Sequence, residues 1–356
     1  MTHFCAPPGM GRRSFLRVAG RSAAVVAAGS AVPWLTGCGT NAAGGAGSGK
    51  GRFKVKLAWI PNAEYAGVFV GAEDGLYTKQ GLDVDILPGG PNSAVVPMVT
   101  TNRVDLGVEA IPENVATAVA RGSKLKIVGA GLLKSPESWI SLADRPVRNP
   151  KEIEGKTLGI TLAGKNTALV FMKRNGVDVS KVKLVPIQFD PAPLAAREVD
   201  AIWGFASNQP VSLALRGVKT HVMPLADFGF NRMQSVFFAS QKTLDDPVAR
   251  ERARKFMTAS RLGWEAALRD QRHAADVIIK RYGAKLGLKL DEQTRSLAAI
   301  APYVSGTGTG TPASTGAGAK GLFWMSDALI EETITSLTSI GIKLDKSLFT
   351  NELLGG

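Results

Sequence analysis

The chain has 356 residues, 45% of them hydrophobic, and a formal net charge of +13. The basic residues are scattered, without a dense run interleaved with aromatic residues, which argues against nucleic-acid binding. The positive charge instead fits a protein that works beside an anionic membrane surface or cell wall, and it is also compatible with an anionic ligand.

Residues 1–37 have the order of an export signal. Four arginines and no acidic residue come first, and a short apolar run follows at 23–32. That run is too short to span a membrane. We therefore predict a signal peptide over residues 1–37. The alternative is a basic, alanine-rich disordered arm.

Two short motifs refine this prediction. Residues 11–17, GRRSFLR, resemble the twin-arginine export motif, and residues 35–38, LTGC, resemble a bacterial lipobox. In such signals the cysteine becomes the lipidated first residue of the mature protein. The resemblance implies lipidation at Cys38. Residues 38–51 are rich in glycine and alanine and predict a flexible tether.

The rest of the chain, about 305 residues from Arg52, suits two lobes better than one core. Cys5 falls within the predicted signal, so the folded body would hold no cysteine. This excludes a disulfide, a cysteine-ligated zinc site and a cysteine nucleophile there. Loss of the four signal arginines leaves 39 of the 43 basic residues against 30 acidic ones.

The body opens with a strand, a turn and a helix. Residues 53–59 alternate apolar and polar side chains, which predicts a strand, and the dipeptide at 61–62 breaks it. Open α/β sheets bind ligands where strands end. We therefore predict that Trp59, Asn62 and Tyr65 form a wall that stacks a flat ring and bonds its edge. A core position is the alternative for Tyr65.

The next strand, predicted at 82–87, runs into a glycine-rich loop. Backbone N–H groups of Gly89 and Gly90 are candidates to face a polar or anionic ligand group. An ordinary tight turn is the alternative. The loop matches neither the Walker pattern nor GxGxxG.

Strands predicted at 104–108 and 126–131 flank a helix at 115–121, and this order implies a mostly parallel sheet. Glu113 follows the first of these strands. It is a candidate acceptor for ring N–H groups. The alternative is a solvated carboxylate at a helix start.

A turn-rich segment at 142–150 predicts a crossing into a second lobe of the same architecture. Its predicted strands lie at 157–161, 182–187, 199–203 and 219–225. Candidate ligand contacts follow these strands: Asn166, Trp203, Asn208, Gln209 and Asp227. The core is again the alternative for Trp203.

The chain is expected to cross back near residue 240, and helices predicted at 248–281 and 323–337 then complete the first lobe. We thus expect an α/β, two-lobed fold, each lobe a mostly parallel sheet flanked by helices, joined by two hinge crossings. Lobe 1 comprises 52–141 and 240–356, and lobe 2 comprises 142–239.

The order of these motifs resembles the nitrate/sulfonate/taurine and thiamine-pyrimidine-precursor family of periplasmic binding proteins. The likeness rests on the motif at 59–62, the segments GLY at 75–77 and GLDV at 81–84, and the segment 203–210. It covers roughly residues 53–355. It implies a periplasmic-binding-protein fold and a solute-binding protein, a monomer that delivers a small molecule to an ABC permease and ATPase. Lipid on Cys38 would anchor it to the outer face of the bacterial cytoplasmic membrane.

The opening motif is most similar to the branch that binds flat heteroaromatics, such as thiamine pyrimidine precursors or riboflavin. Pyrimidine binders of that branch often have Asn-Glu-Pro where this chain has Asn208, Gln209 and Pro210. Glutamine donates and accepts but carries no charge. This departure weakens the pyrimidine assignment. A small anion, such as an alkanesulfonate, taurine or nitrate, is the alternative ligand class.

We expect no enzyme and no cofactor. The body holds two histidines, His221 and His273, neither beside a candidate nucleophile in sequence, and no GxSxG, HExxH or paired-carboxylate motif occurs. The alternatives are an enzyme acting on a pyrimidine-like substrate and an adhesive or structural surface lipoprotein.

Overall fold

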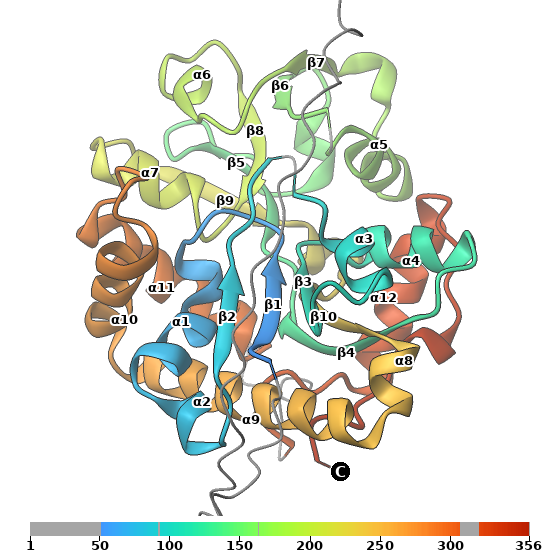
Figure 1. Cartoon of the computed structure of the whole chain (residues 1–356). Coiled ribbons are helices and arrows are strands. Elements are labelled where there is room, and N and C mark those ends of the chain that lie inside the picture. Colours follow the sequence, from blue (N-terminus) through green and yellow to red (C-terminus); the bar gives the residue numbers. More distant parts are fainter. Residues whose placement is uncertain (1–50, 92, 163, 307–319, 356) are drawn as a thin grey trace, which may run out of the picture. The chain divides into compact units, whose positions relative to one another are not determined.

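The computed structural model describes residues 51–91, 93–162, 164–306 and 320–355. The predicted signal peptide, Cys38 and all of the tether except Gly51 lie outside the described residues. Lys50–Gly356 form one compact unit. Two five-stranded sheets organise this unit, here called sheets A and B (Figure 1).

Sheet A has the strand order β2-β1-β3-β10-β4. Its strands are β1 (Phe53–Leu57), β2 (Val84–Leu87), β3 (Leu106–Glu109), β4 (Leu125–Leu132) and β10 (Gln234–Ser240). Strand β1 pairs in parallel with β2 and β3. Strand β10, which arrives from sheet B, is antiparallel to β3 and β4.

Two apolar clusters cover the two faces of sheet A. One face packs on α1 (Ala66–Glu73), α2 (Leu76–Lys79), α9 (Pro247–Arg269), α10 (Gln271–Val277) and α11 (Leu290–Val304). The other packs on α3 (Val95–Thr100), α4 (Pro112–Ala120) and α12 (Asp327–Ser339). Gly263 lets α9 approach α1 closely, since a Cβ there would lie 2.1 Å from the Gly67 carbonyl oxygen.

Sheet B has the order β7-β6-β8-β5-β9. Its strands are β5 (Glu137–Leu142), β6 (Thr157–Ile160), β7 (Lys183–Pro186), β8 (Ala201–Phe205) and β9 (Thr220–Pro224). Strand β6 is parallel to β7 and β8, and β5 is antiparallel to β8 and β9. Its helices are α5 (Lys165–Arg174), α6 (Ala192–Ala195) and α7 (Gln209–Leu215).

Shorter elements connect these parts. The single-turn helices are η1 (Ala63–Tyr65), η2 (Pro150–Ile153), η3 (Val179–Lys181), η4 (Leu225–Phe228) and η7 (Lys346–Leu348), with α8 (Gln241–Asp245) and the π-turn η5 (Ile278–Tyr282). The expected α/β fold class is confirmed, with two sheets that are flanked by helices and joined by two crossings. Each sheet is mixed, because β10 and β5 run antiparallel to their neighbours.

The crossings lie at residues 133–136 and 225–233, several residues before the boundaries at 142 and 240 that we expected from the sequence. Strand β5 accounts for the first difference. It is buried along its whole length yet contains polar residues. Ser138 Oγ donates to the Pro136 carbonyl at 3.0 Å, and Ser141 Oγ accepts from Val147 N at 2.9 Å. Serines satisfied in this way conceal a buried strand in the sequence pattern.

The C-terminal helices also differ from expectation. The helix predicted at 248–281 is divided, because Asp270 ends α9 and its side chain accepts from His273 N to begin α10. Helix α11 was not predicted. In the part of the chain that the structure describes, we find no helix both long and apolar enough to cross a membrane.

Candidate functional site

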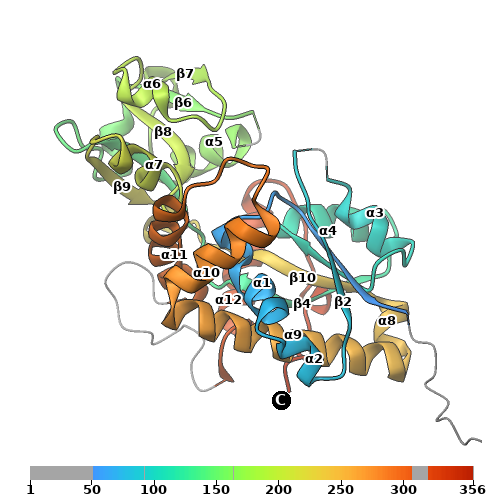
Figure 2. The ribbon, with the colours of Figure 1, turned by 60° about the vertical axis from the view of Figure 1, so that its left-hand side comes forward.

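The two sheets turn their strand ends towards each other. Trp59 follows β1 and Phe189 follows β7, and their ring centroids lie 6.0 Å apart with the planes at 57°. Helices α7 and α11 also lie side by side (Figures 1 and 2). Phe189 keeps 51% of its surface exposed although it touches Trp59. This aromatic pair marks the place where a small molecule would meet both sheets.

The turn after β1 is held by its own side chains. Trp59 N donates to the Tyr65 hydroxyl at 3.2 Å, and Asn62 Oδ1 accepts from Glu64 N at 2.9 Å to begin η1. Tyr65 is buried in the core against Phe69. We expected Tyr65 to contact the ligand, but its ring takes the alternative, a core position, and its hydroxyl holds the backbone of Trp59. Trp59 and Asn62 are half-buried at the strand end.

The glycine loop after β2 closes onto β1. Gly89 N donates to the Trp59 carbonyl at 2.9 Å, and Gly90 N donates to the Ala58 carbonyl at 3.2 Å. A Cβ at Gly89 would lie 2.3 Å from the Leu57 carbonyl oxygen, so only glycine fits this approach. The two N–H groups expected to face a ligand are thus engaged in positioning Trp59.

Two carboxyl groups lie close together beside this turn. Glu64 accepts a hydrogen bond from the Ser235 hydroxyl at the start of β10. Glu109, at the end of β3, accepts from Ala110 N at 3.0 Å and Asn114 Nδ2 at 3.1 Å. Burial raises the pKa of both carboxyls, and the neighbouring Glu109 raises that of Glu64 further. Both residues therefore favour partners that donate hydrogen bonds.

This burial predicts a pH-dependent stability. A carboxyl whose folded-state pKa lies above its ordinary value of 4.5 stabilises the fold below that pH, and the contribution is lost as pH rises through the folded pKa. We expect Glu109→Gln, which mimics the protonated acid, to gain free energy of unfolding relative to wild type as pH rises from 4 to 8. Urea denaturation at pH 4, 6 and 8 measures the difference. A difference independent of pH would contradict this assignment.

The facing end of sheet B is mostly closed by its own packing. Trp203 is 4% exposed and meets Trp139 edge to face at 5.5 Å. Gln209 is buried, and its Oε1 accepts from Phe205 N at 2.8 Å, which ties β8 to α7. Trp203 and Gln209 are thus engaged inside the lobe, Trp203 by Trp139 and Gln209 by Phe205.

The other two candidates on sheet B remain exposed. Asn208 precedes α7 and its side chain makes no capping hydrogen bond. Asn166 lies in the first turn of α5, and its Nδ2 donates to the Ile340 carbonyl at 3.2 Å, just after α12. Asn166 therefore links α5 of one lobe to the segment that follows α12 of the other.

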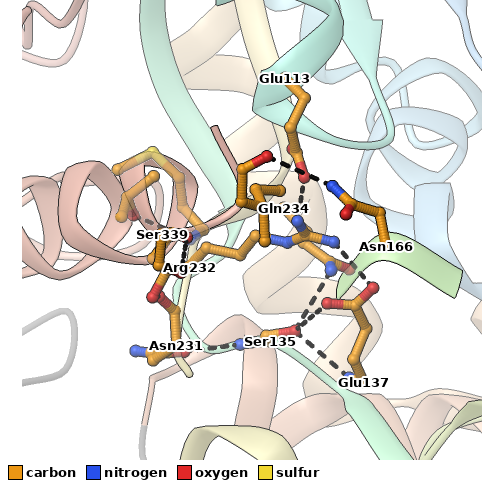
Figure 3. A network of polar contacts seen from close by, with 12 residues as sticks. Glu113, Ser135, Glu137, Asn166, Asn231, Arg232, Gln234 and Ser339 are labelled. Carbon is orange, nitrogen blue, oxygen red and sulfur yellow. Dashed lines mark hydrogen bonds and ion pairs between the residues drawn. The ribbon is translucent and has the colours of Figure 1, made fainter. Parts of the chain in front are cut away.

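The remaining two candidates belong to the crossings. Glu113, in α4, pairs with Arg232 of the second crossing, and the same guanidinium donates from Nη2 to Glu137 Oε1 at 2.7 Å (Figure 3). Asp227 pairs with Lys134 of the first crossing at 2.8 Å. Glu113 and Asp227 are thus engaged in joining the lobes, and neither side chain faces the strand ends unpaired.

Serine and amide groups extend the network around Arg232. Ser135 Oγ donates to Glu137 Oε2 and accepts from Gln234 Nε2, both at 3.2 Å. Asn231 Oδ1 accepts from Ser135 N at 3.0 Å, which joins one crossing to the other (Figure 3). The four buried charged side chains of the described residues all lie near these strand ends and crossings: Glu109, Glu113, Glu137 and Arg232. Two of the three buried carboxyl groups, those of Glu113 and Glu137, therefore share one guanidinium.

Sequence reasoning missed Phe189, Glu137 and Arg232. Phe189 follows a predicted strand, so its place at a strand end could be predicted. Its contact with Trp59 could not, because the two residues are far apart along the chain. Glu137 begins the strand that was not predicted. Arg232 lies in a segment without periodicity, and its acidic partners are 119 and 95 residues away along the chain.

Two cavities, of about 360 and 490 Å³, lie away from the aromatic pair. The first lies between the second crossing and α12, beside Asn231 and Glu332, and the second beside α2. A ring stacked between Trp59 and Phe189 would need centroids about 7 Å apart, twice a carbon contact of about 3.5 Å. The strand ends must therefore separate to admit a ligand there.

The sequence model of the NMT1/THI5-like family matches residues 62–274. The chain belongs to this family. It is 27% identical over 161 residues to a formylaminopyrimidine-binding protein of Halalkalibacterium halodurans, covering 44% of this chain and 48% of the relative. It is 25% identical over 240 residues to the riboflavin-binding protein RibY of Chloroflexus aurantiacus, covering 63% of this chain and 64% of the relative. The matches thus span from about half to under two thirds of these relatives.

Solved structures of periplasmic binding proteins share the fold. The alkanesulfonate-binding protein SsuA of Xanthomonas axonopodis pv. citri, bound to MOPS, superposes with a TM-score of 0.57 at 13% identity, over 84% of this chain and 98% of that one. The desulfurization enzyme DszB superposes with a TM-score of 0.54 at 15% identity, over 85% and 98%. These identities are low, so the likeness concerns the fold alone.

Proposed function

We propose that this chain is the solute-binding protein of an ABC importer and that it captures a small flat heteroaromatic compound between its two sheets. The observation that carries this proposal is the contact of Trp59 with Phe189 where the strand ends meet. Aromatic rings stack on flat ligands with a specific geometry. Relatives named for formylaminopyrimidine and riboflavin support this ligand class.

The acidic side chains near the strand ends favour a ring with N–H donors over an anion. Glu64 and Glu109 lie beside the turn that carries Trp59 and Tyr65, and Arg232 is already engaged by two carboxylates. An alkanesulfonate, taurine or nitrate at this place would meet like charge, which costs binding energy. We propose that Trp59 and Phe189 stack the ring while Asn62, Asn208, Glu64 and Glu109 bond its edge.

Calorimetric titration of the purified protein with formylaminopyrimidine, riboflavin, taurine and nitrate tests this proposal. We expect heat of binding for at least one of the two rings, with an affinity at least tenfold above that for either anion. Binding of taurine or nitrate alone would overturn the ligand class. Chemical conversion of a ring compound into a product during the titration would favour the alternative function, an enzyme acting on a pyrimidine-like substrate. The enzyme DszB shares the fold.

We further propose export of the chain, removal of residues 1–37 and lipidation of Cys38, so that the folded body works beside the importer at the outer face of the membrane. In the native host, Cys38→Ser should move the protein from the membrane fraction to the soluble fraction, because a lipid chain supplies the anchor. Cell fractionation with immunoblotting measures the change. The control is Cys5→Ser, which should leave the protein with the membrane, and equal behaviour of the two variants would contradict the assignment.

A further inference from the structure

The network around Arg232 is incomplete as it stands. Arg232 is 2% exposed and Glu113 is 6% exposed. Arg232 Nε and Glu113 Oε2 are both buried, and neither has a hydrogen-bond partner among the described residues. An unpaired buried polar atom is costly, so a native protein retains one where another arrangement or a bound water satisfies it.

The shape of the guanidinium indicates which arrangement would satisfy Nε. Nε and Nη2 project from the same edge of the group, and a carboxylate on that edge binds both. Glu137 already occupies half of the edge, since its Oε1 accepts from Nη2 at 2.7 Å. Its other oxygen, Oε2, accepts instead from Ser135 Oγ at 3.2 Å. A small rotation would transfer Oε2 from Ser135 to Nε.

The three participants belong to different moving parts. Ser135 lies in the first crossing, Arg232 in the second, and Glu137 is the first residue of sheet B. Arg232 is also tied to sheet A through Glu113 in α4. Rotation of sheet B about the crossings therefore changes which donor Glu137 Oε2 can reach.

We propose that Arg232, Glu137 and Ser135 form a two-position latch that sets the equilibrium between the lobe arrangements. In the first position, described here, Glu137 Oε2 is held by Ser135 and Trp59 touches Phe189. In the second, Oε2 pairs with Arg232 Nε, the guanidinium binds Glu137 through two parallel hydrogen bonds, and the strand ends are apart. Ser135 thus stabilises the first position and Arg232 Nε the second. The latch concerns the hinge and does not depend on the identity of the ligand.

Distances between spin labels test the latch without any ligand. Labels on cysteines replacing Lys79 in α2 and Lys173 in α5, both exposed, report the separation of the lobes. The full chain is used, with Cys5 and Cys38 changed to serine. We expect Ser135→Ala to raise the ratio of the long to the short distance about tenfold, since a hydrogen bond to a charged group is lost from the first position only.

Two further variants keep the outcome decisive. Ser138→Ala removes an equally buried serine hydroxyl that bonds only the Pro136 carbonyl, and it should leave the ratio unchanged. Arg232→Lys keeps the cation but removes Nε, which bonds Glu137 only in the second position, so this variant should lower the ratio. Melting curves confirm that each variant is folded. An unchanged ratio in Ser135→Ala, an equal shift in Ser138→Ala, or a ratio that does not fall in Arg232→Lys would each overturn the latch.

Discussion

Replacing Arg232 with methionine should lower the free energy of unfolding by about 3–5 kcal/mol, because it leaves the carboxyl groups of Glu113 and Glu137 buried without their cation. For a body of this size the melting temperature should fall by roughly 10 °C. Differential scanning calorimetry and urea denaturation of wild type and variant measure both quantities.

A matched surface pair is the control. Arg254 pairs with Glu251 at 2.6 Å, and both side chains are 46% exposed. Arg254→Met should cost no more than about 1 kcal/mol, since water screens an exposed pair. Adding Glu113→Gln and Glu137→Gln to Arg232→Met should recover part of the lost stability, because the penalty comes from buried charge. An equal loss in the Arg232 and Arg254 variants would show that the buried network contributes no more than a surface pair.

Replacing Trp59 with alanine should weaken binding of the ring compound by about 2–4 kcal/mol, or roughly 30- to 1000-fold. Trp59 is half-buried just beyond the end of β1, where its side chain packs against the core and its ring meets that of Phe189 at 57°. Removal of the indole takes away a stacking surface whose backbone is held in place by the Tyr65 hydroxyl and by Gly89 N. Calorimetric titration reads the affinity without relying on tryptophan fluorescence.

The matched control for Trp59 is Trp324→Ala. Trp324 is also half-buried, but its ring contacts Lys320 at 5.0 Å from the centroid. We expect unchanged affinity in this variant. An unaltered affinity in Trp59→Ala, in a variant whose circular dichroism is that of wild type, would place the ligand elsewhere.

Local sequence patterns were sufficient to predict which strand ends and loops form the candidate site. The alternation at 53–59 and the break at 61–62 placed Trp59 at a strand end, where the structure has it. The glycine loop at 88–92 was located correctly. Its role differed, because whether an N–H faces a ligand or a neighbouring strand depends on residues far away along the chain.

The burial of individual side chains and the contacts between residues far apart along the chain could not be predicted from one sequence. Tyr65 and Trp203 look alike in the sequence, as aromatic residues near strand ends, yet both are buried, while Phe189 is exposed. The partners of Arg232 come from α4 and β5. Only the two crossings between the sheets bring these residues together. The first crossing was misplaced because the serines of β5, the strand directly after it, conceal that this strand is buried.

A crystal structure of the protein with the ring compound that binds tightest in the titration would locate the ligand. We expect the ring between Trp59 and Phe189, with a ring or amino N–H donating to Glu64 or Glu109. A ring bound in the cavity beside Asn231 and Glu332, or anywhere without contact to Trp59, would contradict it.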